Sequence, residues 1–372
     1  MIGTLTVHYN ANYGANLQAY ALRKCIANKS KEDVRVIDYR NNLIRNLYTV
    51  RPWNLMSTPP YILVTKESVK RSIKMILNIK GTILRNYRFR TFRKKYVKTT
   101  KTVYTVHDIM KLRCSEIIIG SDQIWNESIT KDENNVFWGS IKNERNYVGA
   151  YAPSFGRSSV TDVEREKIKK YIRNFDYLTV REPSMVNIIQ AYTDKKIEIV
   201  CDPVFLLSQD DWLELAYKVE KKYIFVYILE RNDEVIKIAK KISDKLKLDV
   251  ILLCDGGKLN QKIGTYLKTA DPKDFISLLT NAEFVITNSF HGTAFSVLFN
   301  KKFITIPDTK KSARMLEFLS ICGMKNRICY RASDVTEELM RKSIDYDATN
   351  KIIKEMKEKS LDCIKDMIDH KG

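Results

Sequence analysis

The apolar and polar residues of this 372-residue chain alternate in the way that is typical of strands followed by helices. Residues 2–7 alternate as a strand, and a polar, Gly-containing loop then leads into an amphipathic helix. The run "VRVIDY" at 34–39 indicates a second strand. Because strand, helix and strand in this order begin a parallel sheet, the amino-terminal part of the chain predicts an α/β fold.

The same pattern recurs in two groups of similar size. In the first group, strands with polar ends are expected at 116–126, 146–156, 177–184 and 197–207, with a helix at 162–175. In the second, strands are expected at 223–229, 249–255, 283–289 and 302–307, and helices at 232–247, 272–281, 293–300 and 347–369. We therefore expect an α/β protein of two Rossmann-like domains, 1–208 and 209–346, facing a cleft. A carboxyl-terminal helix within 347–372 could cross back to the first domain.

A basic segment interrupts the first domain at about 41–110, and its pattern predicts an inserted helical segment. Between Lys66 and Lys101 there are 13 basic residues and one acid, a net charge of +12 within a chain total of +20. Such a segment is either an ordinary solvated helix face or a surface for an anionic membrane or a phosphate-bearing acceptor. The chain shows no helix-turn-helix, zinc finger or aromatic RNA-binding signature, which argues against nucleic acid.

The chain lacks the usual signals for export, metals and nucleotide cofactors. Its first ten residues have no basic start, and no apolar run approaches the ~18 residues needed to span a bilayer. Seven scattered cysteines without a C-x-x-C pair favour reduced thiols, so we expect a cytoplasmic protein. The four histidines lie far apart, and no phosphate-binding or dinucleotide-binding glycine motif is present. We therefore expect neither a metal nor a cofactor.

Polar residues follow several of the predicted strands. Because the carboxyl ends of parallel strands meet at one edge of a sheet, these residues are expected to line the cleft. The candidates for the cleft or for acceptor binding are Asn12, Tyr13, Gly14, Ser121, Asp122, Ser154 and Asp202.

The segment "EFVITNSFHGTAFSVLF" at 283–299 places a polar turn between a buried strand and a helix. Asn288, Ser289, His291 and Gly292 belong to this turn. The amides of a helix start attract an anion and favour a neutral imidazole, and a bound anion would reverse that bias. His291 is thus a candidate acid/base for an anionic substrate, or else a neutral histidine that only satisfies a tight turn.

Four cations share the same edge in this scheme. Lys310, Lys311 and Arg314 follow the next strand, and Arg181 ends a strand of the first domain. Since the planar guanidinium suits carboxylate and phosphate, the set predicts a phosphate-bearing or sugar substrate handled without a metal.

Ordered motifs across about 1–330 resemble the polysaccharide pyruvyl transferase family. They are "NYGANLQAYAL", "IIIGSDQIWN", "AYAPSFG", "TVREPS", "CDPVFLL", "TNSFHGTAFSVLF" and "KKSARMLEFLSICGMKNR". The resemblance implies a fold similar to two-domain glycosyltransferases of the B type. It also implies transfer of pyruvate from phosphoenolpyruvate, as co-substrate, to two hydroxyls of a sugar. The products would be a cyclic ketal and free phosphate. Members of the family act in cell-surface polysaccharide synthesis.

Individual residues carry this resemblance. His291 matches the family's histidine near the donor, Arg181 matches an arginine that holds the donor's anionic groups, and Lys310 or Lys311 matches a lysine, with Arg314 just beyond. Many members carry an arginine one or two positions before the histidine, where this chain has Ser289 and Phe290. Either Arg314 or a lysine then takes the role of that arginine, or the donor is a different compound from the family's.

The resemblance also implies a chemical sequence. His291, or a water that it orients, would protonate the methylene carbon of phosphoenolpyruvate, and the identity of the proton donor stays open. A sugar hydroxyl would attack the central carbon, and a second hydroxyl would displace phosphate, with the cations stabilising the leaving group. The acceptor would be a saccharide, carried on a lipid at the inner membrane face, where the basic 66–101 segment could hold the enzyme.

Two other functions fit the same residues. One is a B-type glycosyltransferase that uses a nucleotide sugar. The other is a non-catalytic protein that binds anionic glycans, lipids or nucleic acid through 66–101.

Overall fold

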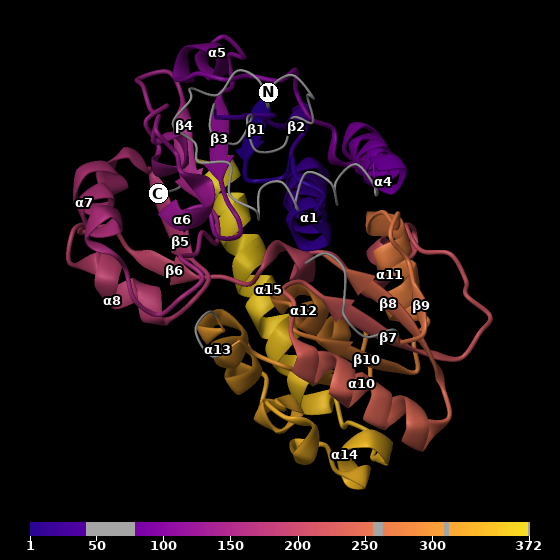
Figure 1. Ribbon diagram of the computed structural model, residues 1–372. Helices are drawn as coiled ribbons and strands as arrows, with labels where there is room; N and C mark the ends of the chain where they lie inside the picture. Colours follow the sequence, from indigo (N-terminus) through magenta and orange to yellow (C-terminus); the bar gives the residue numbers. More distant parts are fainter. Residues whose placement is uncertain (42–78, 256–262, 309–311, 371–372) are drawn as a thin grey trace, which may run out of the picture.

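The first of two parallel sheets contains the amino terminus. The computed structural model describes residues 1–41, 79–255, 263–308 and 312–370. Six parallel strands form this sheet in the order β2-β1-β3-β4-β5-β6. Their bounds are β1 Ile2–Leu5, β2 Val34–Val36, β3 Glu116–Ile119, β4 Tyr147–Ala150, β5 Tyr177–Val180 and β6 Ile197–Ile199. The sheet, with its helices, makes the first unit of the molecule (Figure 1).

The second sheet has five parallel strands in the order β11-β10-β7-β8-β9. Their bounds are β7 Tyr223–Ile228, β8 Asp249–Cys254, β9 Thr265–Tyr266, β10 Phe284–Thr287 and β11 Phe303–Thr305. Strand β7 is central, and every residue of its run "YIFVYI" is buried. Such continuous apolar runs of β-branched and aromatic residues are typical of parallel strands covered on both faces.

Helices lie around both sheets (Figure 1). Those of the first unit are α1 Tyr13–Lys29, α4 Ile79–Phe92, α5 Val106–Met110, α6 Glu127–Thr130, α7 Asp162–Tyr171, α8 Ser184–Gln190 and α9 Gln209–Leu213. Those of the second are α10 Asp233–Leu246, α11 Pro272–Thr280, α12 Phe290–Leu298, α13 Ala313–Ile321 and α14 Glu337–Arg341, and α15 Asp347–Ile368 ends the chain. Two parallel α/β units confirm the predicted fold class.

Three details differ from the sequence expectations. Helix α12 begins at Phe290, so His291 lies in its first turn and not in a loop that precedes the helix. The short edge strand β9 was not predicted, because two residues carry no periodic pattern. Of the predicted insertion at 41–110, residues 42–78 lie outside the described residues, and 79–92 form the single helix α4.

The two units share a hydrophobic core that runs through helix α1. Tyr13, at the start of α1, stacks on Phe275 of α11 with ring centres 5.3 Å apart and meets Tyr227 of β7 edge-on. Its hydroxyl donates to the Ala270 carbonyl at 2.9 Å. Burying large aromatic rings stabilises the contact strongly, so Tyr13 holds the units together and does not face an open cleft.

Helix α4 also connects the units, and it does so with arginines. Arg85 forms an ion pair with Asp255, at the end of β8, and donates to the Ala11 carbonyl at 2.8 Å. Arg88 pairs with Asp271 at 3.1 Å and Asp274 at 2.9 Å, both at the start of α11. These basic residues of the 66–101 segment therefore bind the second unit of the same chain.

Helix α15 runs from the second unit to the first (Figure 1). Near its start, the Thr349 hydroxyl donates to the Cys322 carbonyl at 2.9 Å. Further along, the Ser360 hydroxyl accepts from the Cys201 amide at 2.8 Å, and fully buried Met367 packs against Gly149 of β4. The last helix thus completes the core of the first sheet. None of the helices in the described ranges is both long and apolar enough to cross a bilayer.

The Arg85–Asp255 pair gives a test of the connection between units. Arg85→Ala would leave Asp255, whose side chain is 12% exposed, without its ion partner. Removing one member of a buried pair costs about 3 kcal/mol, so the free energy of unfolding in a denaturant titration should fall by that order. Arg90→Ala removes an exposed arginine of the same helix and should change it by less than about 0.5 kcal/mol. Equal losses in the two variants would contradict this role of Arg85.

Candidate active site

The residues that meet at the boundary of the two units come from the carboxyl ends of their strands. Ser121 and Asp122 follow β3, Arg181 follows β5 and Asp202 follows β6, whereas His291 follows β10. Arg314, in the first turns of α13 after β11, joins them from the second unit. The edge predicted from the strand pattern is therefore the place where residues of both units come together.

His291 is held between the first turn of α12 and the start of α1. Ser289 caps α12, its hydroxyl accepting from the Gly292 amide at 3.5 Å. Gly292 must be glycine, since a Cβ there would lie 2.4 Å from the Thr287 hydroxyl oxygen. Across the boundary, a Cβ on Gly14 would lie 2.1 Å from Nδ1 of His291. The absence of a side chain at position 14 is thus what admits the imidazole, which is only 5% exposed.

Asp202 links the histidine to Arg181. Its Oδ2 lies 3.7 Å from Nε2 of His291 and 3.0 Å from Nη1 of Arg181. Its Oδ1 accepts from the Val204 amide at 3.0 Å, which caps a short 3₁₀ turn and fixes the carboxylate. One carboxylate from the first unit therefore lies between a cation of its own unit and the imidazole of the other.

Asp122 holds the second arginine. Nη1 of Arg314 donates to its Oδ1 at 2.6 Å, and Nη1 of Arg181 is 3.8 Å from the same oxygen. The guanidinium carbons of Arg314 and Arg181 lie 4.3 and 5.3 Å from the centre of the Phe290 ring. Phe290, directly before His291, thus supports two arginines from other elements.

Electrostatics sets the charge of each group. Burial lowers the pKa of His291, and Arg314 and Arg181 lower it further against the opposing effect of Asp202 and Asp122. Burial would raise the pKa of Asp122, but Arg314, His291 and Arg181 outweigh it and hold that pKa well below its usual range. These effects favour a neutral imidazole and a charged Asp122 carboxylate.

Glu182 directly follows Arg181 after β5 and was not among the predicted site residues. Its Oε1 accepts from the Ser154 hydroxyl at 2.9 Å, and burial raises the pKa of its carboxyl group. With Arg181, Asp202, Phe290 and Arg314 it lines a cavity of about 30 Å³ between the units. Its signal in the sequence is its position directly after Arg181 at the carboxyl end of β5.

Several buried polar atoms of this cluster have no hydrogen-bond partner among the described residues. They are Nε2 of His291, Oε2 of Glu182 and Nε of Arg181, whereas Oδ2 of Asp202 and Nη1 of Arg181 contact each other only as the ion pair at 3.0 Å. Buried polar atoms are normally hydrogen-bonded, so this group is suited to a small polar ligand. By contrast, the part of the chain that the structure describes contains no group of three His, Cys, Asp or Glu side chains fit to hold a metal ion.

Other predicted residues have supporting positions. The Ser121 hydroxyl accepts from Nη2 of Arg181 and donates to the Ala152 carbonyl, which orients the guanidinium. Asn12 caps α1 through the Ala15 amide, and Asn288 bonds the Leu229 amide and the Glu230 carbonyl beside β7. Lys310 and Lys311 lie outside the described residues.

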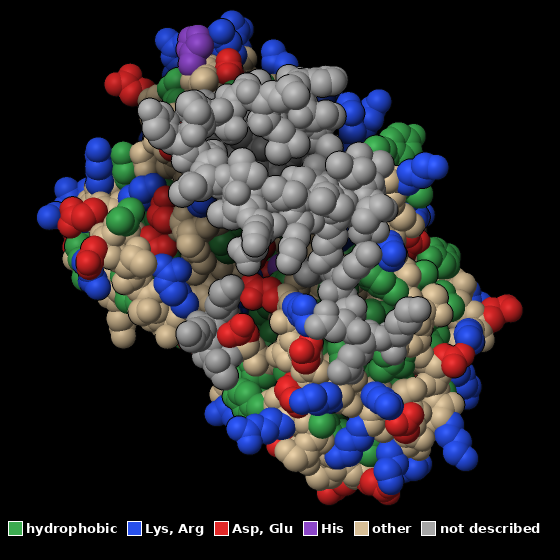
Figure 2. Space-filling model, viewed as in Figure 1, with side chains coloured by type: hydrophobic (Ala, Val, Ile, Leu, Met, Phe, Trp, Pro, Cys, Tyr) green, Lys and Arg blue, Asp and Glu red, His purple; other side chains and the backbone are tan. Residues whose placement is uncertain are grey.

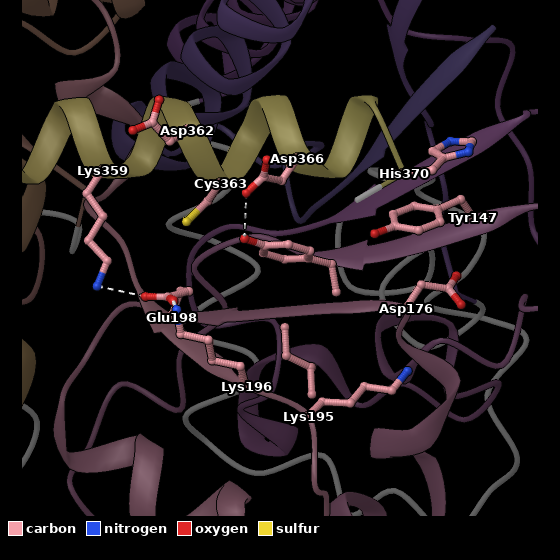
Figure 3. A pocket seen from close by; sticks show the side chains of 12 residues that line it. Tyr147, Asp176, Lys195, Lys196, Glu198, Lys359, Asp362, Cys363, Asp366 and His370 are labelled. Carbon is pink, nitrogen blue, oxygen red and sulfur yellow. Dashed lines mark hydrogen bonds and ion pairs between the residues drawn. The ribbon is translucent and has the colours of Figure 1, made fainter. Parts of the chain in front are cut away.

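A larger pocket of about 730 Å³ lies elsewhere (Figure 3). It is formed by α15 and by residues at the amino ends of β4, β5 and β6, the sheet edge opposite to His291. Its polar groups largely satisfy one another, as in the Lys359–Glu198 ion pair at 2.8 Å and the Tyr177–Asp366 hydrogen bond at 3.4 Å (Figure 3). We therefore place the candidate active site at the His291 cluster.

The fold and this cluster define an α/β protein of two parallel-sheet units, with buried charged residues gathered where the carboxyl edges of both sheets meet. The profile of the polysaccharide pyruvyl transferase family matches residues 12–308, and the chain belongs to that family. The match spans every described site residue except Arg314, and it supports a transferase that acts on polysaccharide.

Solved structures share the fold at low identity. A UDP-N-acetylglucosamine 2-epimerase from Listeria monocytogenes aligns with 8% identity and a TM-score of 0.56, over 100% of this chain and 97% of its own. Another UDP-N-acetylglucosamine 2-epimerase aligns with 9% identity and a TM-score of 0.52, over 99% of this chain and 94% of its own. The S. aureus MnaA–UDP structure aligns with 10% identity and a TM-score of 0.50, over 96% of this chain and 95% of its own. Comparison with curated proteins gave no significant match.

The pKa of His291 offers a test of the arrangement. Because the Asp202 carboxylate raises this pKa, Asp202→Asn should lower it further, and because Arg314 lowers it, Arg314→Gln should raise it. Ring ¹⁵N chemical shifts followed against pH measure both effects. Asp194→Asn, which removes an exposed carboxylate before the amino end of β6, at the sheet edge opposite to His291, serves as the control and should have no effect. A His291 pKa that does not respond to Asp202→Asn would contradict the described contact.

Proposed function

We propose that this protein moves pyruvate from phosphoenolpyruvate onto two hydroxyls of a saccharide, forming a cyclic ketal and releasing phosphate. The observation that carries the proposal is the meeting of Arg181 and His291, from different units, with Arg314 around buried polar atoms that lack hydrogen-bond partners. Membership of the family supports it. The acceptor would be lipid-linked, and the enzyme would work at the cytoplasmic face of the membrane.

The donor would bind by exchange of anions. The two arginines are compensated by ion pairs with Asp202 and Asp122. A carboxylate or phosphate of the donor would take the place of Asp122 at Arg314, since the planar guanidinium forms paired hydrogen bonds with either group. Arg314 would thereby supply the cation that is missing at Ser289 and Phe290, with Lys310 and Lys311 as further candidates.

The same exchange would prepare the proton transfer. The bound anion raises the pKa of the neighbouring neutral imidazole, which lets His291 hold the proton that the methylene carbon of the donor requires. One acceptor hydroxyl then forms a C–O bond to the central carbon and gives its proton to the imidazole, which has just lost one to the methylene carbon. A second hydroxyl forms the other C–O bond as the bond between the central carbon and the phosphate oxygen breaks, and the phosphate leaves with that electron pair and takes up the proton of the second hydroxyl. The arginines stabilise the charge on the departing phosphate.

Product formation gives the direct test. Incubation with phosphoenolpyruvate and a panel of lipid-linked or nitrophenyl sugars should yield one sugar with a mass gain of pyruvate less water, together with free phosphate. His291→Ala should keep the fold, measured by circular dichroism, and lose phosphate release by at least about 100-fold. Full phosphate release by a pure His291→Ala preparation would sink the proposal. So would thermal stabilisation by a nucleotide sugar and not by phosphoenolpyruvate.

Gly14 gives a second, sterically defined test. Gly14→Ala places a methyl group within 2.1 Å of the present position of Nδ1, so the ring must move and turnover should fall by about 100-fold. Gly81→Ala is the matched control, because a Cβ there has no neighbour within 4 Å. It should leave turnover unchanged. Equal activity of the two variants would show that the position of the imidazole is not critical.

A further inference from the structure

Helix α4 has two faces of different character. Its inner face carries Arg85, Phe89 and Phe92, and both phenylalanines are buried. Its outer face carries Ile83, Leu84 and Tyr87, which are 57%, 47% and 65% exposed. Ile83 and Leu84 come four and three positions before Tyr87, so the three side chains lie together on one side of the helix. Packing against the described residues therefore does not account for the apolar character of this side.

Basic residues surround the exposed apolar residues. Lys80 and Arg90 lie one turn before and after them on the helix, and Lys94 and Lys95 follow; all four are exposed. The stretch 79–97 contains no aspartate or glutamate. Figure 2 shows hydrophobic side chains and Lys or Arg side chains next to one another at the place of α4. We call these seven residues the α4 face.

A mostly apolar groove of about 220 Å³ continues from this face. Tyr87, Phe92, Tyr96, Lys95 and Lys273 line it together with Thr91, Arg88 and Asp271, and the last two form an ion pair with each other at 3.1 Å. The Nζ atoms of Lys95 and Lys273 lie 5.2 and 5.8 Å from the centre of the Tyr96 ring. Aromatic and aliphatic residues beside ammonium groups are the combination that suits a phospholipid, with its chain against the rings and its phosphate near the lysines.

We propose that the α4 face and this groove bind the surface of a membrane that contains anionic phospholipid. Lysine and arginine near such a surface are attracted by its negative potential, and the exposed apolar side chains enter the interface. A polyanionic polysaccharide would satisfy the lysines but would leave Ile83, Leu84 and Tyr87 exposed to water. The observations therefore favour lipid.

The position of α4 would bring a bound membrane close to the candidate active site. This part of the inference rests on the proposed function. Arg85 on the inner face bonds Ala11, three residues before Gly14, which packs on His291. A membrane on the outer face would therefore lie close to the boundary that holds the candidate active site. A sugar carried on a lipid could reach the site without leaving the membrane.

Sedimentation of the full chain with vesicles tests the inference. We expect the protein to bind vesicles of phosphatidylcholine mixed with phosphatidylglycerol, to bind phosphatidylcholine alone at least tenfold less, and to be released by salt. Leu84→Ser with Tyr87→Ser, and separately Lys94→Gln with Lys95→Gln, should each weaken binding about tenfold or more.

Matched controls use exposed residues on other elements. Val163→Ser with Ile129→Ser removes two apolar side chains that are 60% and 46% exposed, and Lys218→Gln with Lys354→Gln removes two exposed lysines. Both pairs should bind as the wild type does. The inference is overturned if the wild type fails to bind vesicles or binds neutral vesicles equally well. It is also overturned if the control variants lose as much binding as the α4-face variants.

Turnover with a soluble sugar separates this inference from the proposed function. The α4-face variants should keep wild-type turnover with a soluble acceptor while losing vesicle binding. Vesicle binding without any pyruvyl transfer by the wild type would refute the proposed function alone. Transfer without charge-dependent vesicle binding would refute the α4 inference alone.

Discussion

The compensation of two buried arginines is the constraint on which the candidate site depends. Arg181 and Arg314 are 7% and 9% exposed, so each needs a carboxylate nearby to offset the loss of water. Asp202 and Asp122 provide those carboxylates from the carboxyl ends of β6 and β3. Because Asp122 of the first unit holds Arg314 of the second, the same ion pair fixes the charge of the site and the position of one unit against the other.

The boundary between the units is otherwise made by contacts that leave little room to slide. Tyr13 inserts among aromatic rings of the second unit, Arg85 and Arg88 hold it from α4, and α15 spans both units. The imidazole of His291 sits against the one position of α1 that has no side chain. The geometry of the proton-handling group is therefore decided by the packing between units as much as by its own helix.

Much of this arrangement could be predicted from the sequence, because parallel strands leave strong signals. The apolar runs and their polar ends located the carboxyl edges, and with them His291, Arg181, Asp122 and Asp202. The pairing among these residues could not be predicted, since it depends on how two units meet and no local pattern encodes that. Tyr13 shows the difference, because an aromatic residue in a loop motif was expected at the cleft and instead fills the contact between units.

Short elements and helix starts without a periodic apolar pattern also could not be predicted from the sequence. Strand β9 is two residues long, and helix α12 begins three residues before the position expected from its apolar run, because a capping serine and a glycine precede that run. Glu182 was visible as a strand-end residue, yet only its buried hydrogen bond to Ser154 distinguishes it from a surface acid. Its membership of the cluster is a tertiary property.

The route of helix α15 has a consequence for how the molecule is made. Ile364 and Met367 are fully buried and belong to the core around the first sheet, although they follow its strands by a long stretch of chain. During synthesis, the strands that contain Gly149 and precede Cys201 emerge from the ribosome well before the residues that cover them. The first sheet therefore keeps apolar surface uncovered until the whole second unit and α15 have also been made.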